Sequence, residues 1–393
     1  MIASIVKSFI HQRIARLQEK MEELGLGGAI IYKPENVFYF SHFNPVLNST
    51  PVFLFVPCRG ESVLLVHCIR YSHALEEGGI DRVVCYGKWG SAPSLAMDPF
   101  EGLKKICGKV SVLGLELDSL EVAKYNQIIN ALAVDRIYSL SEEIFHMKLI
   151  KDSYEIDCIR KAARLVDEGV RVTIDSLKKG LSEADACTEG QYAMRKLWGK
   201  DYKEYEIAGF GTSEGGMTDS LQVWCLSNEH IAYGCDCSRF YVPKEGDISL
   251  PMAWAKLDGY HAENERTCAK GELSGIRKRA LNAVLAARKE VFPLVKPGVS
   301  FEKLYLTAMD VFTEYGFGDI LPGRIGHGVG NSAHEFPSVT KGNQLLLMPG
   351  MVITIEPGLM DAGWGGARHS DTVLITENGM ERLTTLDNGW ISF

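Results

Sequence analysis

Short runs of apolar, β-branched and aromatic residues recur along the first 145 or so residues and alternate with stretches of helical pattern. The apolar runs are residues 28–33, 52–57, 62–67, 82–86 and 109–114, and the helix-like stretches are 12–24, 98–107 and 119–132. Apolar runs of this length are typical of buried strands. Strands that alternate with helices predict an α/β layered first domain.

A second unit begins after the segment 147–153, where Ser153 and Glu155 precede apolar positions with a period of three to four residues. That pattern predicts a helix capped by Ser153. Further predicted elements are helices at 182–198, 274–294 and 300–315 and strand-rich segments at 205–268 and 325–390. The chain is therefore expected to divide into residues 1–147 and 153–393.

Asp258-Gly259 lies between two apolar runs, 248–255 and 260–268, and this dipeptide is a strong hairpin signal. Glu263 and Glu265 then stand two residues apart on one strand, so their side chains share a face of the sheet. A buried carboxylate without a partner is costly. We therefore expect Glu263, Glu265 and Glu356 to face one polar cavity.

Composition indicates a folded protein, because 46% of the 393 residues are hydrophobic and 23% are charged. The net charge is -8 and no long Lys/Arg run occurs, which argues against a nucleic-acid or anionic-membrane partner. No apolar stretch approaches the roughly 20 residues that span a bilayer. Ten cysteines are scattered without framework spacing and the first residues lack the pattern of a signal peptide. A cytoplasmic protein with a small-molecule substrate is expected.

Five segments carry candidate chemistry: Asp258–Thr267, Gly326–Gly330, His334–Pro337, Met351–Gly358 and Gly365–Val373. Their order and spacing resemble the creatinase/prolidase/aminopeptidase P/methionine aminopeptidase superfamily, the pita-bread fold, from about residue 150 to the end. The first domain resembles the N-terminal domain of the creatinase and prolidase branches. The resemblance implies an α+β protein with an α/β N-terminal domain followed by a pita-bread catalytic domain.

The resemblance also implies where metal ligands would lie, since the peptidase members hold two metal ions on two Asp, one His and two Glu. His327 and Glu356 occupy the His and first Glu positions, and Glu263 occupies the second Asp position. Met252 and Ser370 occupy the first Asp and last Glu positions, and neither can balance a divalent cation. We therefore expect no metal cofactor. One weakly held divalent ion, such as Mn, Co or Zn, on Glu263, His327 and Glu356 is the alternative.

Glu265-Arg266-Thr267 and Glu356 resemble creatinase, the metal-free branch that hydrolyses a C–N bond in a guanidino acid. Two carboxylates without a metal suit a cationic substrate, because its charge relieves their mutual repulsion. The sequence therefore predicts a creatinase-like, metal-independent hydrolase of a C–N bond in a small cationic or zwitterionic metabolite. Glu265 and Glu356 are expected to grip the cation.

His334 matches the His with which the peptidases bind substrate and stabilise the transition state, so the resemblance assigns it to catalysis beside Glu265 and Glu356. The expected substrate-binding set is Glu263, Glu265, His327, Glu356 and Arg368. The general base of creatinase falls at Tyr233, with His230 as the alternative three residues away. Trp224, Trp254 and Trp364 are expected to pack in the core, with a cation-binding pocket as the alternative.

Three alternatives stay open at this point. The first is a metal-dependent Xaa-Pro dipeptidase or aminopeptidase with a degenerate metal site. The second is a non-catalytic small-molecule or peptide-binding protein. The third is a lyase on the same scaffold. Glu263 or Glu265 would instead be structural if it paired with Arg266 or Arg368. Creatinase-like proteins form homodimers, and a symmetric dimer is the commonest oligomer, so a homodimer is expected.

Overall fold

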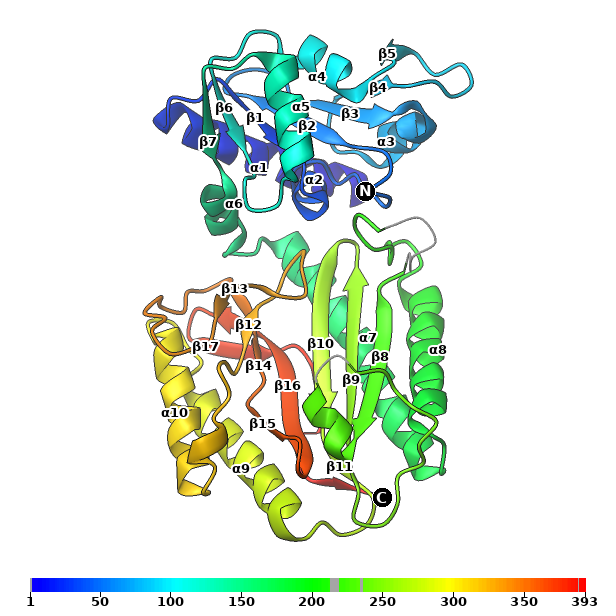
Figure 1. Ribbon diagram of the computed structural model, residues 1–393, viewed down its shortest axis with the longest axis vertical. Helices are drawn as coiled ribbons and strands as arrows, with labels where there is room; N and C mark the ends of the chain where they lie inside the picture. Colours follow the sequence, from blue (N-terminus) through cyan, green and yellow to red (C-terminus); the bar gives the residue numbers. More distant parts are fainter. Residues whose placement is uncertain (1, 213–218, 234–235, 388) are drawn as a thin grey trace. The chain divides into compact units, whose positions relative to one another are not determined.

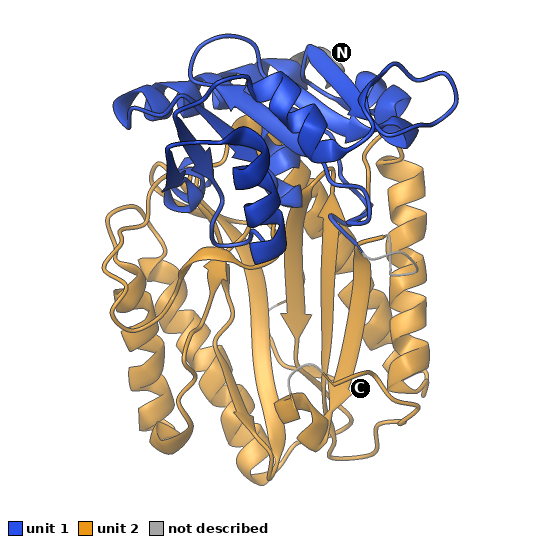
Figure 2. Cartoon of the chain, turned by 45° about the horizontal axis from the view of Figure 1, so that its top comes forward, with its two compact units in different colours: residues 1–148, 208–218 blue, residues 149–207, 219–393 orange. Residues whose placement is uncertain are grey.

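The computed structural model describes residues 2–212, 219–233, 236–387 and 389–393. The chain forms two compact units, which Figure 2 distinguishes by colour. The first consists of residues 1–148 and 208–218, and the second of residues 149–207 and 219–393. In the described part of the chain, no helix combines the length and the apolar character needed to cross a membrane.

The first unit contains a seven-stranded sheet in the order β5-β4-β3-β2-β1-β6-β7, as the described residues show it (Figure 1). Its strands are β1 Gly28–Ile31, β2 Phe53–Pro57, β3 Val63–His67, β4 Arg82–Tyr86, β5 Ser94–Ala96, β6 Val112–Leu115 and β7 Arg136–Ser139. Its helices are α1 Ile2–Glu23, α2 Pro34–Ser41, α3 Tyr71–Glu77, α4 Pro99–Cys107, α5 Val122–Leu132 and α6 Ser141–Lys148, with the 3-10 turn η1 Cys68–Arg70. Strand β2 pairs antiparallel with β1 and β3, and the other pairs are parallel.

Apolar side chains of this sheet form a core with α4 and α5. Ile30, Phe53, Leu65, Leu103 and Leu113 are fully buried in it. All five apolar runs singled out in the sequence contain strands, because buried β-branched and aromatic residues favour that conformation. The helical pattern missed α2, α3 and α6, which are only seven or eight residues long and too short for a clear period.

The second unit opens with α7 Ser153–Lys178, which begins with a capping box. The N-cap is Asp152 rather than the predicted Ser153: its carboxylate accepts hydrogen bonds from the backbone of Tyr154 and Glu155. The Glu155 side chain in turn accepts from the Asp152 backbone N–H. The predicted helix is therefore present with its cap one residue earlier.

The described residues of the second unit form an eleven-stranded sheet, whose main path is β13-β12-β14-β16-β10-β9-β11-β18. Strands β15 and β17 pair with β16, and β8 pairs with β9. The strands are β8 Leu221–Ser227, β9 Ile248–Leu257, β10 Tyr260–Arg266, β11 Cys268–Ala269, β12 His327–Gly328, β13 Glu335–Ser338, β14 Val352–Ile355, β15 Gly358–Asp361, β16 Gly365–Thr376, β17 Gly379–Arg382 and β18 Ile391–Ser392. The other helical elements are α8 Glu183–Asp201, η2 Asn228–Tyr233, α9 Gly275–Val291, η3 Phe292–Leu294, α10 Phe301–Glu314 and η4 Gly318–Ile320.

Two pairs of helices cover one side of this sheet (Figure 1). Helix α7 packs on β9 and β10, α8 packs on β8, and α9 packs on β16 with α10 beside it. The strands β8, β9, β10 and β16 thus turn one face toward helices. Residues on alternate positions point the other way and are available to build a site.

A buried ionic cluster fixes α9 to the sheet. Asp371 of β16 accepts hydrogen bonds from Arg266 of β10 at 2.7 Å, from the Thr384 hydroxyl at 2.6 Å, and from Arg288 of α9. Burial opposes ionisation of Asp371, but the two guanidinium groups outweigh it and lower its pKa. The cluster therefore holds β16, which carries Arg368 and Ser370, in a fixed position relative to β10.

Candidate metal centre and active site

Strand register gathers the candidate residues on one face of the sheet. Strands β9 and β10 form the predicted hairpin at Asp258-Gly259, and Glu265 lies opposite Met252 on one side and Ser370 on the other. Because side chains two residues apart share a face, Glu263 and Arg368 lie on this face as well. The prediction that Glu263 and Glu265 point to the same side is confirmed by this register.

His327 and Glu356 come to the same place from neighbouring strands. His327 begins β12, which pairs with β14, and Glu356 directly follows β14. The glycines on either side of His327 are required by close backbone contacts: a Cβ on Gly326 would lie 2.2 Å from the Thr354 carbonyl oxygen, and one on Gly328 would lie 2.5 Å from the Phe336 carbonyl oxygen. This packing fixes the backbone that carries the imidazole.

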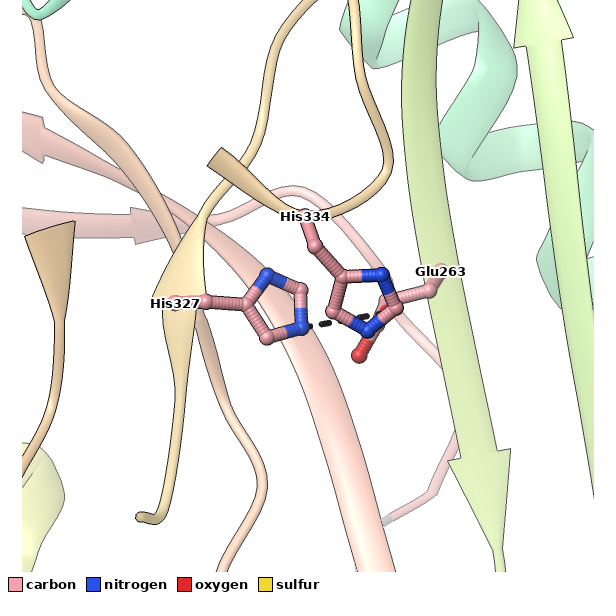
Figure 3. A group of neighbouring side chains, drawn as sticks. All are labelled: Glu263, His327 and His334. Carbon is pink, nitrogen blue, oxygen red and sulfur yellow. Dashed lines mark ion pairs between the residues drawn. The ribbon is translucent and has the colours of Figure 1, made fainter. Parts of the chain in front are cut away.

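The side chains of His327, His334 and Glu263 face one another (Figure 3). His327 Nε2 lies 3.6 Å from Glu263 Oε2 and 3.4 Å from Glu356 Oε1. The rings of His327 and His334 have centroids 4.3 Å apart. The potential ligand atoms of Glu263, His327 and His334 all lie within 4.8 Å of one another. His334 immediately precedes β13 and is exposed, whereas His327, Glu263 and Glu356 are buried.

The hydrogen bond made by His327 Nδ1 determines whether His327 Nε2 is protonated or has a free lone pair. Nδ1 of His327 lies 3.0 Å from the Gly328 carbonyl oxygen, and because a carbonyl only accepts, Nδ1 carries the proton. In the neutral ring, Nε2 then presents a lone pair toward two carboxylates. Nε2 is buried and has no hydrogen-bond partner among the described residues. This arrangement requires a cation, either a second proton on the ring or a metal ion.

The buried charges shift the pKa values of His327, Glu263 and Glu356. Burial opposes the charged form of His327, but Glu263 and Glu356 outweigh it and raise the pKa of His327 to about 9. Burial also opposes ionisation of Glu263, yet His327 and the Ser370 hydroxyl lower its pKa to about 2. The pKa of Glu356 is raised by burial and by Glu263. Negative charge is therefore concentrated at Glu263, next to the imidazole.

Glu265 pairs with Arg368 rather than with Arg266. Arg368 Nη2 lies 2.6 Å from Glu265 Oε1, and Arg368 Nε donates to the other carboxylate oxygen. Arg266 points to the opposite side of the sheet, toward Asp371. The ion pair with Arg368, one of the alternatives from the sequence, is thus present in the structure. Glu265 and Glu356 also lie close enough to Glu263 that the three carboxylates share one region.

A cavity of about 420 Å³ opens beside this cluster. It is lined by Ser220, Gln222, Trp224, Met252, Trp254, His261, Ala333, His334 and Arg368. Trp224 and Trp254 meet edge to face with ring centroids 5.2 Å apart, and Trp254 Nε1 donates to Glu263 Oε2 over 3.2 Å. These two tryptophans line the cavity instead of packing only in the core. The period-2 alternation of β8 and β9 contained this signal, since Gln222 and Trp224 of β8 lie opposite Trp254 and Met252 of β9 on one face.

The two candidates for a general base lie elsewhere. His230 and Tyr233 belong to η2, and their rings stack with centroids 5.4 Å apart. His230 Nε2 lies 2.8 Å from Arg239 Nη1, and its Nδ1 lies 3.5 Å from Asp236 Oδ2. Neither residue belongs to the ligand cluster or to the lining of the cavity, as far as the described residues show.

Two known protein families match separate parts of the chain. Residues 157–377 match Metallopeptidase family M24, and residues 13–150 match the Creatinase/Prolidase N-terminal domain. These matches and the solved prolidase structures below confirm the predicted superfamily and its pita-bread fold.

Individual relatives match over almost the whole chain. A putative dipeptidase of Bacillus subtilis (strain 168) is 30% identical over 372 residues, which are 95% of this chain and 97% of that protein. An Xaa-Pro dipeptidase of Pyrococcus furiosus is 28% identical over 95% of this chain and 97% of that protein. The structure is similar to the prolidases of Pyrococcus furiosus (TM-score 0.79, 27% identity, 94% of this chain and 99% of that one) and Pyrococcus horikoshii OT3 (TM-score 0.82, 25% identity, 97% and 100%).

These findings overturn the prediction of a protein without a metal cofactor. The matched family is one of metallopeptidases, and Glu263, His327 and His334 form a candidate metal site. Counting missing carboxylates led to the wrong result, because it left out His334, which the sequence had assigned to catalysis and not to a ligand set. The nitrogen and oxygen donors of Glu263, His327, His334 and Glu356 suit a borderline divalent ion such as Mn, Co or Zn.

Proposed function

This chain belongs to metallopeptidase family M24 and is a hydrolase of C–N bonds, and from that premise we propose that it is a metal-dependent dipeptidase acting on Xaa-Pro dipeptides. The creatinase-like, metal-independent reaction expected from the sequence is not supported, because the relatives described above are named dipeptidases and prolidases. The alternative left open there, a peptidase whose metal site departs from the usual ligand set, accounts better for the cluster.

The observation that carries the proposal is the buried Nε2 of His327, which faces Glu356 at 3.4 Å and Glu263 at 3.6 Å without a hydrogen bond. Glu263, His327 and Glu356 would hold a divalent ion at this point. When bound, such an ion supplies a Lewis acid that polarises a peptide carbonyl and makes water a better nucleophile at neutral pH. His327 is oriented for this role by the hydrogen bond from its Nδ1 to Gly328.

His334 is placed to act on the substrate. Partial burial of the imidazole and the neighbouring His327 lower the pKa of His334, which favours the neutral ring at pH 7. The ring both lines the cavity and lies against His327. A neutral imidazole in this position can donate a hydrogen bond to the carbonyl oxygen of the scissile bond, where negative charge develops during hydrolysis.

The cavity suits a small substrate with a compact apolar ring. Its volume of about 420 Å³ lies within the range of small-molecule sites. The indole rings of Trp224 and Trp254 offer flat apolar surfaces, against which a pyrrolidine ring can pack. Because Trp254 also contacts Glu263, a ring held there lies next to the ligand cluster.

The test is hydrolysis of a panel of Xaa-Pro dipeptides by purified protein, with Xaa-Ala dipeptides of the same first residue as matched controls. Release of proline that requires added Mn²⁺ and stops with a chelator is the expected result. A panel of guanidino acids, including creatine, runs in parallel. Turnover of a guanidino acid that is indifferent to chelation, with no release of proline, would overturn the proposal.

We also propose that the protein is a homodimer of the cytoplasm. The dimer rests on the resemblance to creatinase-like proteins and on the general preference of soluble proteins for symmetric pairs. The location is supported by the cysteines, since the nine in the described residues are free thiols, as a reducing compartment maintains them.

A further inference from the structure

Two groups of potential metal ligands lie side by side and share Glu263. The first consists of Glu263, His327 and His334, and the second of Glu263, Glu265 and Glu356. Within each group the potential ligand atoms lie within 4.8 Å of one another. Two adjacent groups would accommodate a pair of ions only if both were free to accept one.

The second group already contains a cation. The Arg368 guanidinium contacts both oxygens of Glu265, with Nη2 2.6 Å from Oε1, and Nη2 also lies 3.5 Å from the Met252 sulfur. Glu265 and Glu356 raise the pKa of Arg368 against the effect of burial, and an arginine side chain keeps its proton in proteins. A metal ion at Glu265 would have to displace a two-point ion pair.

The charges of the site fit a single divalent ion. Three buried carboxylates, Glu263, Glu265 and Glu356, face one guanidinium, so the site holds at most two uncompensated negative charges, which one divalent ion neutralises. His327 is neutral when it binds a metal ion, and Met252 and Ser370 add no charge, since Met252 is apolar and the Ser370 hydroxyl donates to Glu263 over 2.6 Å. A second divalent ion would bring uncompensated positive charge into a buried site, at high cost.

From these contacts the geometry points to a mononuclear centre, in which one divalent ion lies among Glu263, His327 and Glu356 and Arg368 permanently takes the place of a second ion. The inference rests on the metal-binding part of the proposed function but not on its substrate. Arg368 is thus the residue that sets the number of ions. It lies in the wall of the cavity, so its fixed charge is also presented to whatever enters.

The experiment counts bound metal in the protein without substrate. Chelator-stripped protein is titrated with Mn²⁺ by calorimetry, and the electron paramagnetic resonance spectrum is recorded on the saturated sample. We expect one equivalent of Mn²⁺ and the six-line spectrum of an isolated ion. Two equivalents of Mn²⁺, or a spectrum that shows coupling between two ions, would overturn the inference. This test uses the unmodified protein.

Variants at position 368 test the role of the guanidinium. Arg368→Met removes the charge while keeping an unbranched side chain, frees the group of three carboxylates, and should raise the stoichiometry from one Mn²⁺ to two. Arg368→Lys keeps the charge and should stay at one. Arg324→Met is the matched control, because the partly exposed Arg324 lies 3.9 Å from Glu356 but is not part of the Glu265 ion pair. A folded Arg368→Met protein that still binds one ion would refute the role assigned to Arg368.

The result is independent of the peptidase assay. If the protein binds one Mn²⁺ but releases no proline from any dipeptide, the substrate proposal fails and the mononuclear centre stands. If proline is released and two ions bind, the substrate proposal stands and the inference about Arg368 fails.

Discussion

The indole nitrogen of Trp254 donates a hydrogen bond to Glu263 Oε2 over 3.2 Å, so one residue joins the wall of the cavity to a ligand of the proposed metal. Glu263 Oε1 meanwhile accepts from Ser370 over 2.6 Å. Both oxygens of the carboxylate are therefore oriented by donors. Such partners behind a metal ligand fix its direction and its basicity.

Replacing Trp254 by Phe keeps an aromatic wall and removes the donor. We expect Mn²⁺ to bind about 10- to 100-fold more weakly, as is typical when a partner of a ligand is lost. Trp224→Phe is the matched control, because it changes the neighbouring indole without touching Glu263. Calorimetric titration of both variants provides the comparison. Equal Mn²⁺ affinities for the two variants would show that the Trp254 hydrogen bond does not orient Glu263.

Metal removal should destabilise the protein, because a ligand that binds only the folded state adds to the free energy of unfolding. At Mn²⁺ 100-fold above its dissociation constant the gain is about 2.7 kcal/mol, which corresponds to several degrees of melting temperature. Thermal denaturation with Mn²⁺ and with chelator measures this shift. His327→Ala should abolish it, and a shift of unchanged size in that variant would place the ion elsewhere.

His334→Gln tests the role of the exposed imidazole. If His334 stabilises charge on the carbonyl oxygen, kcat for an Xaa-Pro dipeptide should fall by roughly 10²- to 10³-fold. KM and the Mn²⁺ stoichiometry should change little, since Glu263, His327 and Glu356 remain. Steady-state kinetics separate the two parameters. A loss confined to KM would instead make His334 a binding residue.

Asp371→Asn should be strongly destabilising, because it leaves Arg266 and Arg288 buried without their anionic partner. The expected loss is about 3–5 kcal/mol, measured by denaturant unfolding at pH 7. Asp81→Asn breaks only exposed pairs, with Lys7 and His11, and should cost less than about 1 kcal/mol.

The stability lost in Asp371→Asn should depend on pH. The pKa of Asp371 is lowered in the folded protein, so its contribution is complete above the unfolded value of about 3.9 and disappears as the pH falls through the folded pKa. The difference in stability between the parent and Asp371→Asn should therefore be constant near neutrality and shrink below about pH 4. A difference that grows on acidification would contradict the assignment.

The mass of the protein in solution tests the proposed dimer. Light scattering at micromolar concentration should give about twice the chain mass of 43.5 kDa. A mass equal to one chain would rule out a stable dimer.

Local sequence patterns determined much of the scaffold. Asp258-Gly259 set the hairpin, and the two-residue period then put Glu263 and Glu265 on one face, as the register shows. The apolar runs of the first unit became strands for the same local reason. The order of motifs around His327 and Glu356 was enough to indicate the superfamily. Turn residues and side-chain alternation depend on only a few neighbouring residues, so both can be predicted from the sequence alone.

The chemistry of the site depended on contacts between distant segments. The sequence offered both Arg266 and Arg368 as partners of Glu265, and only the pairing of β10 with β16 decided for Arg368. Likewise the prediction of a site without metal was overturned by the metallopeptidase family match and by the tertiary structure, which brings Glu263, His327 and His334 together as potential ligands. Charge compensation in a buried site is a sum over all neighbours in space, and only the folded chain determines which neighbours those are.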